Sequence, residues 1–272
     1  MTTEQAHRFA RERGVSRPLY ALARVVLALF LRLYFRVRIF GGEHIPRQGA
    51  AIIAPNHKDF WDAFFIALAT RRPVRFMTAS ETLRGVHSGL LVRLGAFPVK
   101  RGESDQEAVE TARVILRQGG LLAVFPEGTT IAAADVLGPP HRGAARLALE
   151  LGVPLIPAAI TGTDRLRLGP VLKPKHVEVA FSEPILVPAQ PLSTPEAAGE
   201  LMQRQVWPVV QTQLERLRAR PGLIALAVTA LGISGALALR QRRAKRRRRA
   251  PARMLRAALP RPRLRRAKDR RA

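Results

Sequence analysis

Short apolar segments alternate with segments of helical periodicity from residue 50 to residue 160, and this alternation limits the possible folds most strongly. Apolar segments of strand length, each followed by a helix, are typical of parallel strands joined by crossover helices. The sequence therefore predicts an α/β fold with a largely parallel central sheet flanked by helices. The expected strands are 35–40, 50–55, 73–78, 95–100, 121–125 and 153–160, and the expected helices are 62–70, about 86–93, 104–118 and 142–151.

Two of these helices carry their own end signals. Ser104 and Glu107 have the spacing of a capping box at the start of 104–118, and Gly119 follows its last position. Gly152 marks the end of 142–151 in the same way. We expect both helices to stop at these glycines.

The segment 18–33 is apolar except for arginines. On a helix, Arg17, Arg24 and Arg32 fall within an arc of about 80°. This pattern suits a helix that lies in a membrane interface with its arginines toward the lipid headgroups. The alternative is a helix packed on the domain with a solvated basic stripe. We predict an N-terminal segment, 1–34, with a membrane-interface helix and no cleaved signal peptide.

The C-terminal part of the chain differs in composition from the rest. Residues 221–239 are uncharged and long enough for an apolar membrane helix, within an expected membrane segment 219–239. The tail 240–272 holds 17 Arg and Lys against one Asp, within a net charge of +26, and is expected to be disordered. A span would separate the domain, 35–218, from the tail, so we expect 221–239 to stay in the cytoplasmic leaflet.

The tail has two functional interpretations. Arginines beside an apolar segment favour anionic lipids, whereas a polyanion-binding protein that contacts nucleic-acid phosphates is the alternative. Because the apolar segment is adjacent, we expect membrane lipids as partners and no specific nucleic acid. The oligomeric state is not predicted.

The chain contains no cysteine, which excludes disulfides and thiol nucleophiles. Apart from His57, the histidines show no metal-binding spacing; they are His7, His44, His87, His141 and His176. No phosphate-binding glycine loop follows an expected strand. We therefore expect neither a metal nor a bound cofactor.

Polar residues follow three of the expected strands. His57 follows the strand 50–55, Lys100 and Arg101 lie at the end of the strand 95–100, and Glu127 follows the strand 121–125. Ligands of open α/β sheets bind at the carboxyl ends of the strands, so these side chains are candidates for one site. A base, two cations and an acid suit a substrate that loses a proton and carries an anionic group.

His57 and Asp62 stand five positions apart at a strand-to-helix junction. They can meet only if the chain turns between them, because this interval separates them by about 140° on a helix. Alternatively, Asp59 is a helix N-cap and Asp62 belongs to the first helical turn. Spacing alone leaves both interpretations open.

Four ordered motifs resemble a known family. The segment "PNHKDFWDAFF" is similar to the NHxxxxD motif of the glycerolipid acyltransferases of the 1-acylglycerol-3-phosphate acyltransferase type. "GAFPVKR", "FPEGTT" and "VPLIPAAI" resemble its next three motifs, and the similarity runs from about 35 to 181. The resemblance implies the glycerolipid acyltransferase fold and transfer of an acyl group from a thioester to a lipid hydroxyl.

The resemblance also implies roles for individual residues. His57 would be the general base and Asp62 its carboxylate partner. Arg101, assisted by Lys100, would hold the phosphate of the acceptor. Glu127, Gly128 and Thr129 belong to the motif assigned to acceptor binding.

The substrates implied are acyl-CoA or acyl carrier protein and a lysophospholipid, with 1-acylglycerol-3-phosphate as the first choice. The enzyme would act on the cytoplasmic face of the cell membrane. Two positions depart from the family pattern, with Asp59 in place of a frequent Ser and Thr130 in place of a usual Arg. Another lipid acceptor is therefore an alternative, as is a non-catalytic lipid-binding protein.

Overall fold

The structure is a computed structural model. It describes residues 1–219 except positions 86, 101–104, 132, 134, 135, 165, 169, 170 and 191, and the side chains at 167, 168 and 171. The predicted phosphate ligand Arg101, the segment 221–239 and the tail 240–272 lie outside the described residues. Residues 1–219 form one compact unit.

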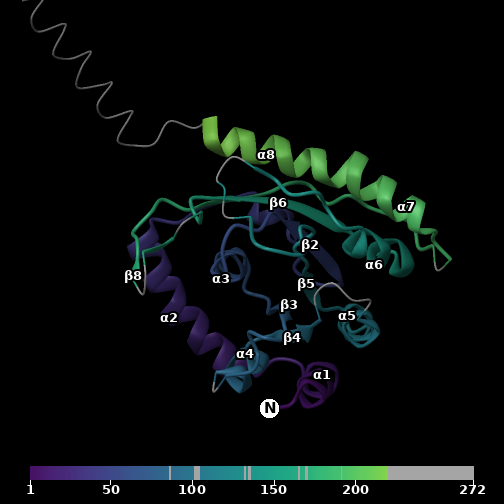
Figure 1. Cartoon of the computed structure of the whole chain (residues 1–272), viewed down its shortest axis with the longest axis horizontal. Coiled ribbons are helices and arrows are strands. Elements are labelled where there is room, and N and C mark those ends of the chain that lie inside the picture. The colour runs from purple at the N-terminus through teal and green to yellow at the C-terminus, as the bar shows by residue number, and fades with distance from the viewer. Residues whose placement is uncertain are drawn as a thin grey trace, which may run out of the picture. The chain divides into compact units, whose positions relative to one another are not determined.

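A seven-stranded sheet lies at the centre of this unit (Figure 1). Its order is β1-β9-β6-β2-β5-β3-β4, and all neighbours are parallel except the antiparallel pair β6 and β9. The largely parallel α/β sheet predicted from the sequence is confirmed. Its strands are β1 (Arg38–Phe40), β2 (Ala51–Pro55), β3 (Val74–Ala79), β4 (Ala96–Val99), β5 (Leu121–Ala123), β6 (Leu155–Thr161) and β9 (Glu178–Phe181). Strands β7 (Arg167–Leu168) and β8 (Val171–Leu172) form a separate antiparallel pair.

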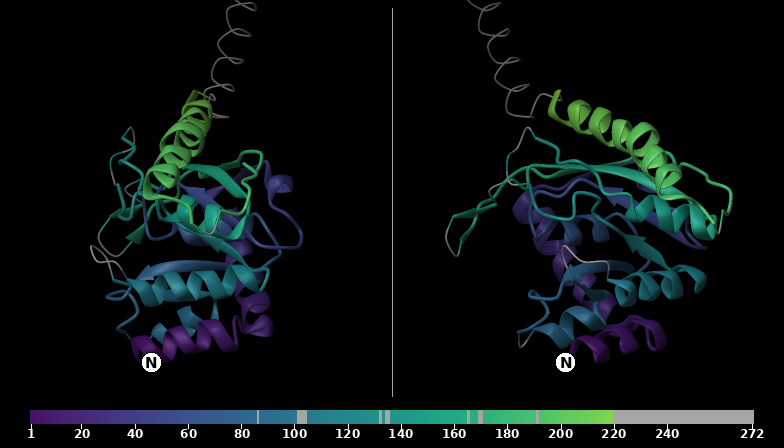
Figure 2. Two further views of the ribbon diagram at one scale, coloured as in Figure 1. Left: turned by 90° about the vertical axis from the view of Figure 1, so that its right-hand side faces the viewer. Right: turned by 45° about the vertical axis from the view of Figure 1, so that its right-hand side comes forward.

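Helices surround the sheet, as the three views show (Figures 1 and 2). They are α1 (Thr3–Glu12), α2 (Arg17–Phe35), α3 (Asp62–Leu68), α4 (Ser88–Arg93), α5 (Gln106–Arg117), α6 (Gly143–Leu151), α7 (Pro195–Glu200) and α8 (Trp207–Ala219). A 3₁₀ turn, Gly42–His44, follows β1, and a π-helical segment, Leu201–Val206, joins α7 to α8.

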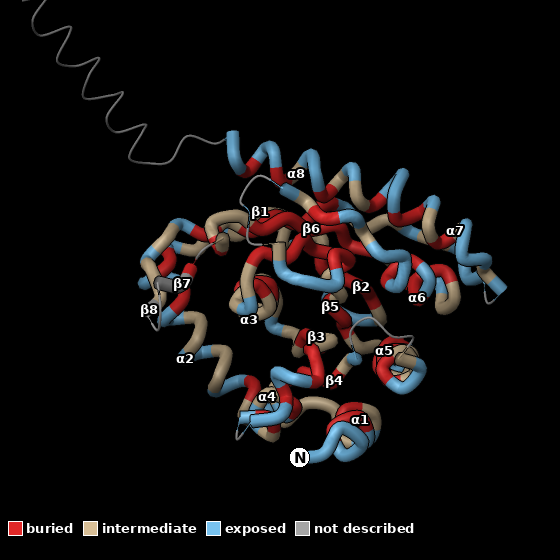
Figure 3. The backbone as a smooth tube through the Cα atoms, viewed as in Figure 1, coloured by how far each residue is buried: buried red, intermediate tan, exposed pale blue. Residues whose placement is uncertain are grey.

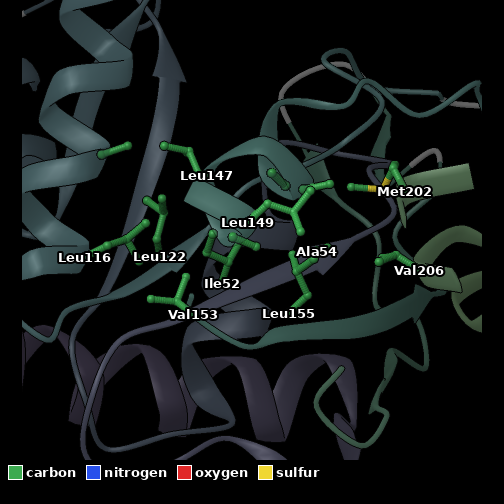
Figure 4. Close-up of a cluster of buried hydrophobic side chains, with 14 of the residues drawn as sticks. Ile52, Ala54, Leu116, Leu122, Leu147, Leu149, Val153, Leu155, Met202 and Val206 are labelled. Carbon is green, nitrogen blue, oxygen red and sulfur yellow. The ribbon is translucent and has the colours of Figure 1, made fainter. Parts of the chain in front are cut away.

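Strand β2 shows how the sheet organises two hydrophobic cores. Successive side chains of a strand point to opposite faces. Ile52 and Ala54 therefore pack with α5, α6 and the C-terminal helices, as the close-up shows (Figure 4). Ala51 and Ile53 pack on the other face with α2 and α3. Because the central strands are buried on both faces, they appear in the sequence as continuous apolar runs.

Several element limits differ from the sequence prediction. Strand β1 begins at Arg38 rather than at residue 35, because α2 continues to Phe35. Helix α5 is capped by Asp105, whose side chain accepts from the N–H of Ala108, so the predicted capping box is wrong. Helix α6 ends at Gly152 in the left-handed conformation, as predicted.

Helix α1 was not predicted. Its capping box joins Thr2 and Gln5, and its buried face consists of Ala6, His7 and Ala10. Two alanines and a histidine give too weak an apolar pattern for a helix to be recognised from periodicity. Packing against α4, α5 and β4 supplies the stabilisation that the local sequence lacks.

Helix α2 is the only described helix long and apolar enough to cross a bilayer by length and composition. Only 17% of its most apolar window is buried, and Figure 3 shows it largely as exposed and intermediate residues. Arg24 turns toward the domain and donates to the carbonyl of Thr70 at 3.0 Å, so the predicted basic stripe is interrupted. The exposed face is instead apolar: Leu22, Val25, Val26, Leu29, Phe30 and Leu33.

Candidate active site

Asn56 fixes the end of β2, where the chain leaves the sheet. The last backbone pair between β2 and β6 joins Pro55 to Ala158. Beyond it, Oδ1 of Asn56 accepts from the N–H of Ile160 at 2.8 Å, and Nδ2 donates to its carbonyl at 3.1 Å. The amide side chain thus continues the ladder by one step. His57, the next residue, starts from a rigid point.

The turn after His57 brings Asp62 back to it. Nδ1 of His57 lies 2.9 Å from Oδ2 of Asp62, and Asp62 is fully buried at the first position of α3. The same oxygen accepts from the N–H groups of Lys58 at 2.6 Å and Asp59 at 2.8 Å. Three donors on one oxygen fix the position of the carboxylate.

The alternative role of Asp59 as N-cap of α3 is wrong. The residue before this helix is Trp61, which makes no side-chain cap. The carboxylate of Asp59 accepts instead from the N–H of Trp61 at 3.0 Å and so stabilises the turn before the helix. Asp62 does lie in the first helical turn, and the same turn carries it toward His57.

The ring of His57 is held flat against Phe125. The ring centroids are 4.0 Å apart and the planes differ by 23°. Nδ1 contacts Asp62, while Nε2 receives no hydrogen bond from any described residue, and the side chain stays 11% exposed. Nε2 is therefore the atom that can accept a proton from a ligand. The sequence prediction gave Phe125 no role, although it begins the FPEG motif.

Glu127 supports the backbone on which His57 stands. Its Oε1 accepts from the N–H of His57 at 2.9 Å, and its Oε2 accepts from the N–H of Gly138 at 3.0 Å. The residue is 4% exposed, and burial raises the pKa of its carboxyl, while the two N–H bonds and Lys58 act against this rise. The predicted contact with a substrate hydroxyl stays a prediction, because both oxygens already have backbone donors.

Lys58 is a buried cation of the site that sequence reasoning missed. Its ammonium donates to the carbonyls of Ala133, at 2.8 Å, and Val136. Burial lowers the pKa of Lys58, and the carboxylate of Glu127 is the main opposing influence. A single lysine inside a motif gives no sequence signal for such a contact, because its partners lie about 75 residues away.

Gly128, Thr129 and Thr130 are exposed beside this network. Gly128 has a φ of 65°, and a Cβ atom there would lie 3.1 Å from the ring of His141. Both the left-handed backbone and the close ring favour glycine. The ring of His141 thus borders the FPEG turn, a placement the sequence did not predict.

Lys100 follows β4 at the same edge of the sheet. Strands β5 and β3 lie between β2 and β4, so the two strand ends are about 14 Å apart at ordinary strand spacing. Lys100 is exposed, and its N–H donates to Asp105 at 2.8 Å. The structure therefore places Lys100 on the correct edge but does not describe Arg101, its predicted companion.

An apolar groove lies between α2 and α3, with residues of β3, α4 and β4 also in its wall. Phe60, three residues after His57, lies in its wall. Helix α3 contributes alanines and a phenylalanine, and α2 contributes small and apolar residues opposite them. Its wall is formed by Tyr20, Ala23, Arg24, Leu27, Phe60, Ala63, Phe64, Ala67, Leu68, Phe76, Thr78, Leu91, Leu94 and Ala96.

Among the described residues, no three His, Cys, Asp or Glu side chains come together in a group that could hold a metal ion. The site consists instead of a histidine–aspartate pair, a buried lysine that donates to two carbonyls, a buried glutamate that accepts from two backbone N–H groups, and a nearby apolar groove.

Residues 36–161, which contain all of these paired side chains, match the family model Acyltransferase. These residues are similar to that family, and the match covers less than half of the chain. The resemblance to acyltransferases predicted from the sequence is thereby confirmed over these residues. Helices α1 and α2 and the segment from β9 to α8 lie outside the matched residues of the acyltransferase domain.

Named relatives agree with this assignment. A 1-acyl-sn-glycerol-3-phosphate acyltransferase of Bacillus subtilis is 27% identical over 146 residues, which are 53% of this chain and 72% of that protein. A chloroplastic 1-acyl-sn-glycerol-3-phosphate acyltransferase of Brassica napus is 24% identical over 149 residues, which are 53% of this chain but 43% of that protein. The chain thus spans less than half of the Brassica relative.

A solved structure shows the same fold. The crystal structure of the 1-acyl-sn-glycerophosphate (LPA) acyltransferase PlsC from Thermotoga maritima aligns with a TM-score of 0.57 at 22% identity, over 81% of this chain and 85% of that one. The acyltransferase domain therefore has a mixed α/β fold with a central sheet flanked by helices.

Proposed function

We propose that this protein transfers a fatty acyl group from a thioester, acyl-CoA or acyl carrier protein, to a hydroxyl of a lysophospholipid. The observation that carries the proposal is the His57–Asp62 pair, in which Nε2 of His57 has no hydrogen bond to a described residue. An apolar groove supports it, because Phe60 of the same turn lies in the wall of the groove. The first-choice acceptor is 1-acylglycerol-3-phosphate, which would give phosphatidic acid. This acceptor is supported by the names of the Bacillus subtilis and Brassica napus relatives.

The proposed reaction is a direct transfer. The acceptor hydroxyl gives its proton to Nε2 of His57 as its oxygen attacks the thioester carbonyl carbon. Asp62, bonded at Nδ1, stabilises the imidazolium that forms. The carbon–sulfur bond then breaks, and the departing thiolate takes up the proton from Nε2 of His57. The transfer therefore needs no reactant other than the thioester and the acceptor.

The apolar groove suits the acyl chain. Its wall includes Phe60, which lies in the turn from His57 to Asp62, here called the catalytic turn. The wall continues along α3 to Leu68. A saturated chain has no polar group to satisfy, so an apolar groove binds it through burial alone. The groove thus accounts for a fatty acyl donor better than for a short acyl group.

The exposed face of α2 supports attachment to a membrane. A contiguous apolar face is unusual on a monomeric soluble protein and marks contact with lipid or protein. Lipid substrates reside in such a surface, so attachment there brings the groove to them. We place the protein on the cytoplasmic face of the cell membrane, where acyl thioesters are made.

The acceptor is the least constrained part of the proposal. Thr130 replaces an arginine that the family pattern usually has, and this removes one cation near the FPEG turn. A neutral or zwitterionic lysolipid is therefore the alternative acceptor. The head group of the acceptor must therefore be identified by an assay.

The test is an acceptor screen with the purified full-length chain, labelled acyl-CoA or acyl carrier protein, and a panel of lysolipids. The proposal predicts a labelled diacyl product that depends on His57. If His57→Ala transfers acyl groups as fast as wild type, the mechanism is refuted. Lipid binding without transfer by wild type on any acceptor would support the non-catalytic alternative instead.

A further inference from the structure

The backbone of His57 is held on both sides by the segment that follows β5. Its N–H donates to Glu127, and its carbonyl accepts from the N–H of Ile131 at 2.8 Å. The position of the ring therefore depends on where residues 127–131 lie. These residues follow β5, which is the strand paired with β2, and they lie about 70 positions further along the chain.

The side chain of Lys58 reaches the next part of the same segment. While its N–H donates to Asp62, its ammonium donates to the carbonyls of Ala133 and Val136. Gly138, two residues further, is bonded to Glu127. The segment is thus attached to the turn from His57 to Asp62 at three described positions, Ile131, Ala133 and Val136. Gly138 is attached to it indirectly, through Glu127.

A buried ammonium needs a reason. Lys58 is 4% exposed, and removing such a charge from water is unfavourable unless partners replace the water. The two carbonyls and the nearby Glu127 carboxylate are these partners. An apolar side chain would avoid the desolvation penalty but could not hold two carbonyls. The charge of Lys58 therefore makes two backbone contacts that an apolar side chain could not make.

We propose that Lys58 is a positioning residue for the transfer reaction, which fixes His57 by anchoring the segment from Ile131 to Gly138 against the catalytic turn. The inference rests on the proposed function for its kinetic consequences. It assigns Lys58 no contact with either substrate. Its role is distinct from that of Asp62, which contacts the ring itself.

The size of the effect follows from geometry. Without the ammonium, the carbonyls of Ala133 and Val136 lose their donor, and the bond between Ile131 and His57 loses its support. A displacement of about 1 Å at a reacting group can lower the rate about 10²-fold. Lys58→Met, which keeps the length of the chain and removes the charge, should therefore lower kcat about 10- to 100-fold. KM for the acceptor should change less than threefold.

Two further variants of the full-length chain separate positioning from stability. Lys58→Arg keeps a cation that can donate to both carbonyls and should recover part of the lost kcat. Arg72→Met is the matched control, because Arg72, like Lys58, is a cation that donates to backbone carbonyls, but it lies away from the site. Its three acceptors are the carbonyls of Pro46, Gly49 and Gly119. It should lower the free energy of unfolding and leave kcat within twofold.

The pH profile gives a second readout. The charge of Lys58 lowers the pKa of Glu127, so its removal raises that pKa further. A protonated Glu127 accepts more weakly at the oxygen that carries the proton, so its bond to His57 or to Gly138 is weakened. The acid limb of kcat should therefore move to higher pH in Lys58→Met and stay in place in Arg72→Met.

A readout independent of turnover keeps this inference apart from the proposed function. The ring proton of His57, assigned in labelled protein by its loss in His57→Ala, should shift in the NMR spectrum of Lys58→Met and not of Arg72→Met. An unchanged resonance overturns the inference even if the enzyme is active. A shifted resonance in a protein that transfers nothing would refute only the proposed function. A raised acceptor KM with unchanged kcat would make Lys58 a substrate ligand and also overturn the inference.

Discussion

Nδ1 of His57 lies 2.9 Å from Oδ2 of Asp62, and that oxygen also accepts two backbone N–H groups of the turn between them. The backbone bonds fix the carboxylate, and the carboxylate fixes the ring. Because all three donors converge on one oxygen, the pair can be tested for charge without loss of geometry.

Asp62→Asn should fold normally and lose activity. The amide oxygen can accept the same three N–H groups, so the turn is kept, but the negative charge that stabilises the imidazolium is gone. We expect kcat to fall on the order of 10²- to 10⁴-fold with little change in the free energy of unfolding. Asp59→Asn is the control and should stay near wild type. Equal activity in both variants contradicts the assigned pair.

Asn56→Ala should cost stability as well as rate. It leaves the N–H and the carbonyl of Ile160 without their buried partners. We expect a loss of about 1 to 3 kcal/mol in the free energy of unfolding by urea. Gln118→Ala removes an exposed bond to the carbonyl of Arg11 and should lose under about 0.5 kcal/mol. Similar losses in the two variants would speak against a structural role of Asn56.

Ala23→Phe should shorten the acyl chains that the protein accepts. Ala23 faces the groove next to Arg24, which bonds Thr70 beyond the end of α3, away from His57. A phenyl ring there fills the far end of the groove. The expected result is a lower rate with long acyl donors and an unchanged rate with short ones, measured over a series of chain lengths. Ala21→Phe, on the exposed face of α2, should leave the series unaltered.

The exposed face of α2 should enter lipid. Since the chain has no cysteine, Leu29→Cys can be labelled alone with an environment-sensitive fluorophore. Leu29 is 62% exposed, and we expect a blue shift on addition of anionic vesicles, with quenching by spin-labelled lipid. Leu192→Cys, at a leucine that is 95% exposed but lies before α7, should show neither effect. A probe at residue 29 that stays in water would exclude the membrane role of α2.

His7 should make the fold sensitive to mild acid. Thr111 donates its hydroxyl to the carbonyl of Glu107, so it accepts from Nδ1 of His7, and the buried Nε2 has no partner among the described residues. Burial lowers the pKa of His7, with Glu107 and Asp105 opposing and Arg11 adding to the effect. The unfolded chain therefore binds the proton more readily. Stability is fully present above a pH of about 6.5 and falls below it.

The measurement for His7 is the free energy of unfolding against pH. The contribution of one group changes by at most about 1.4 kcal/mol per pH unit. His7→Gln, which can keep the bond to Thr111, should lose less stability than wild type between pH 7 and pH 5.5. Parallel curves would show that protonation of His7 does not contribute.

The sequence was informative where the signal is local. Continuous apolar runs predicted the strands β2 to β6. The five-residue interval from His57 to Asp62 allowed the two side chains to meet if the chain turned between them. Element ends were less certain, as at Arg38 and Asp105, because neighbouring residues can serve equally well as start or cap. Helix α1 escaped recognition because its buried face is small and its stability comes from packing against α4, α5 and β4.

The sequence by itself determined the alternation of strands and helices, the spacing of His57 and Asp62, and the apolar character of α2, since each depends on contiguous spacing. The tertiary structure alone decided that Phe125 stacks on His57, that both oxygens of Glu127 hold backbone N–H groups, and that Lys58 reaches Ala133. These contacts join residues about 70 positions apart. Their distances are set by the order of strands in the sheet and by burial, which no local pattern in the chain encodes.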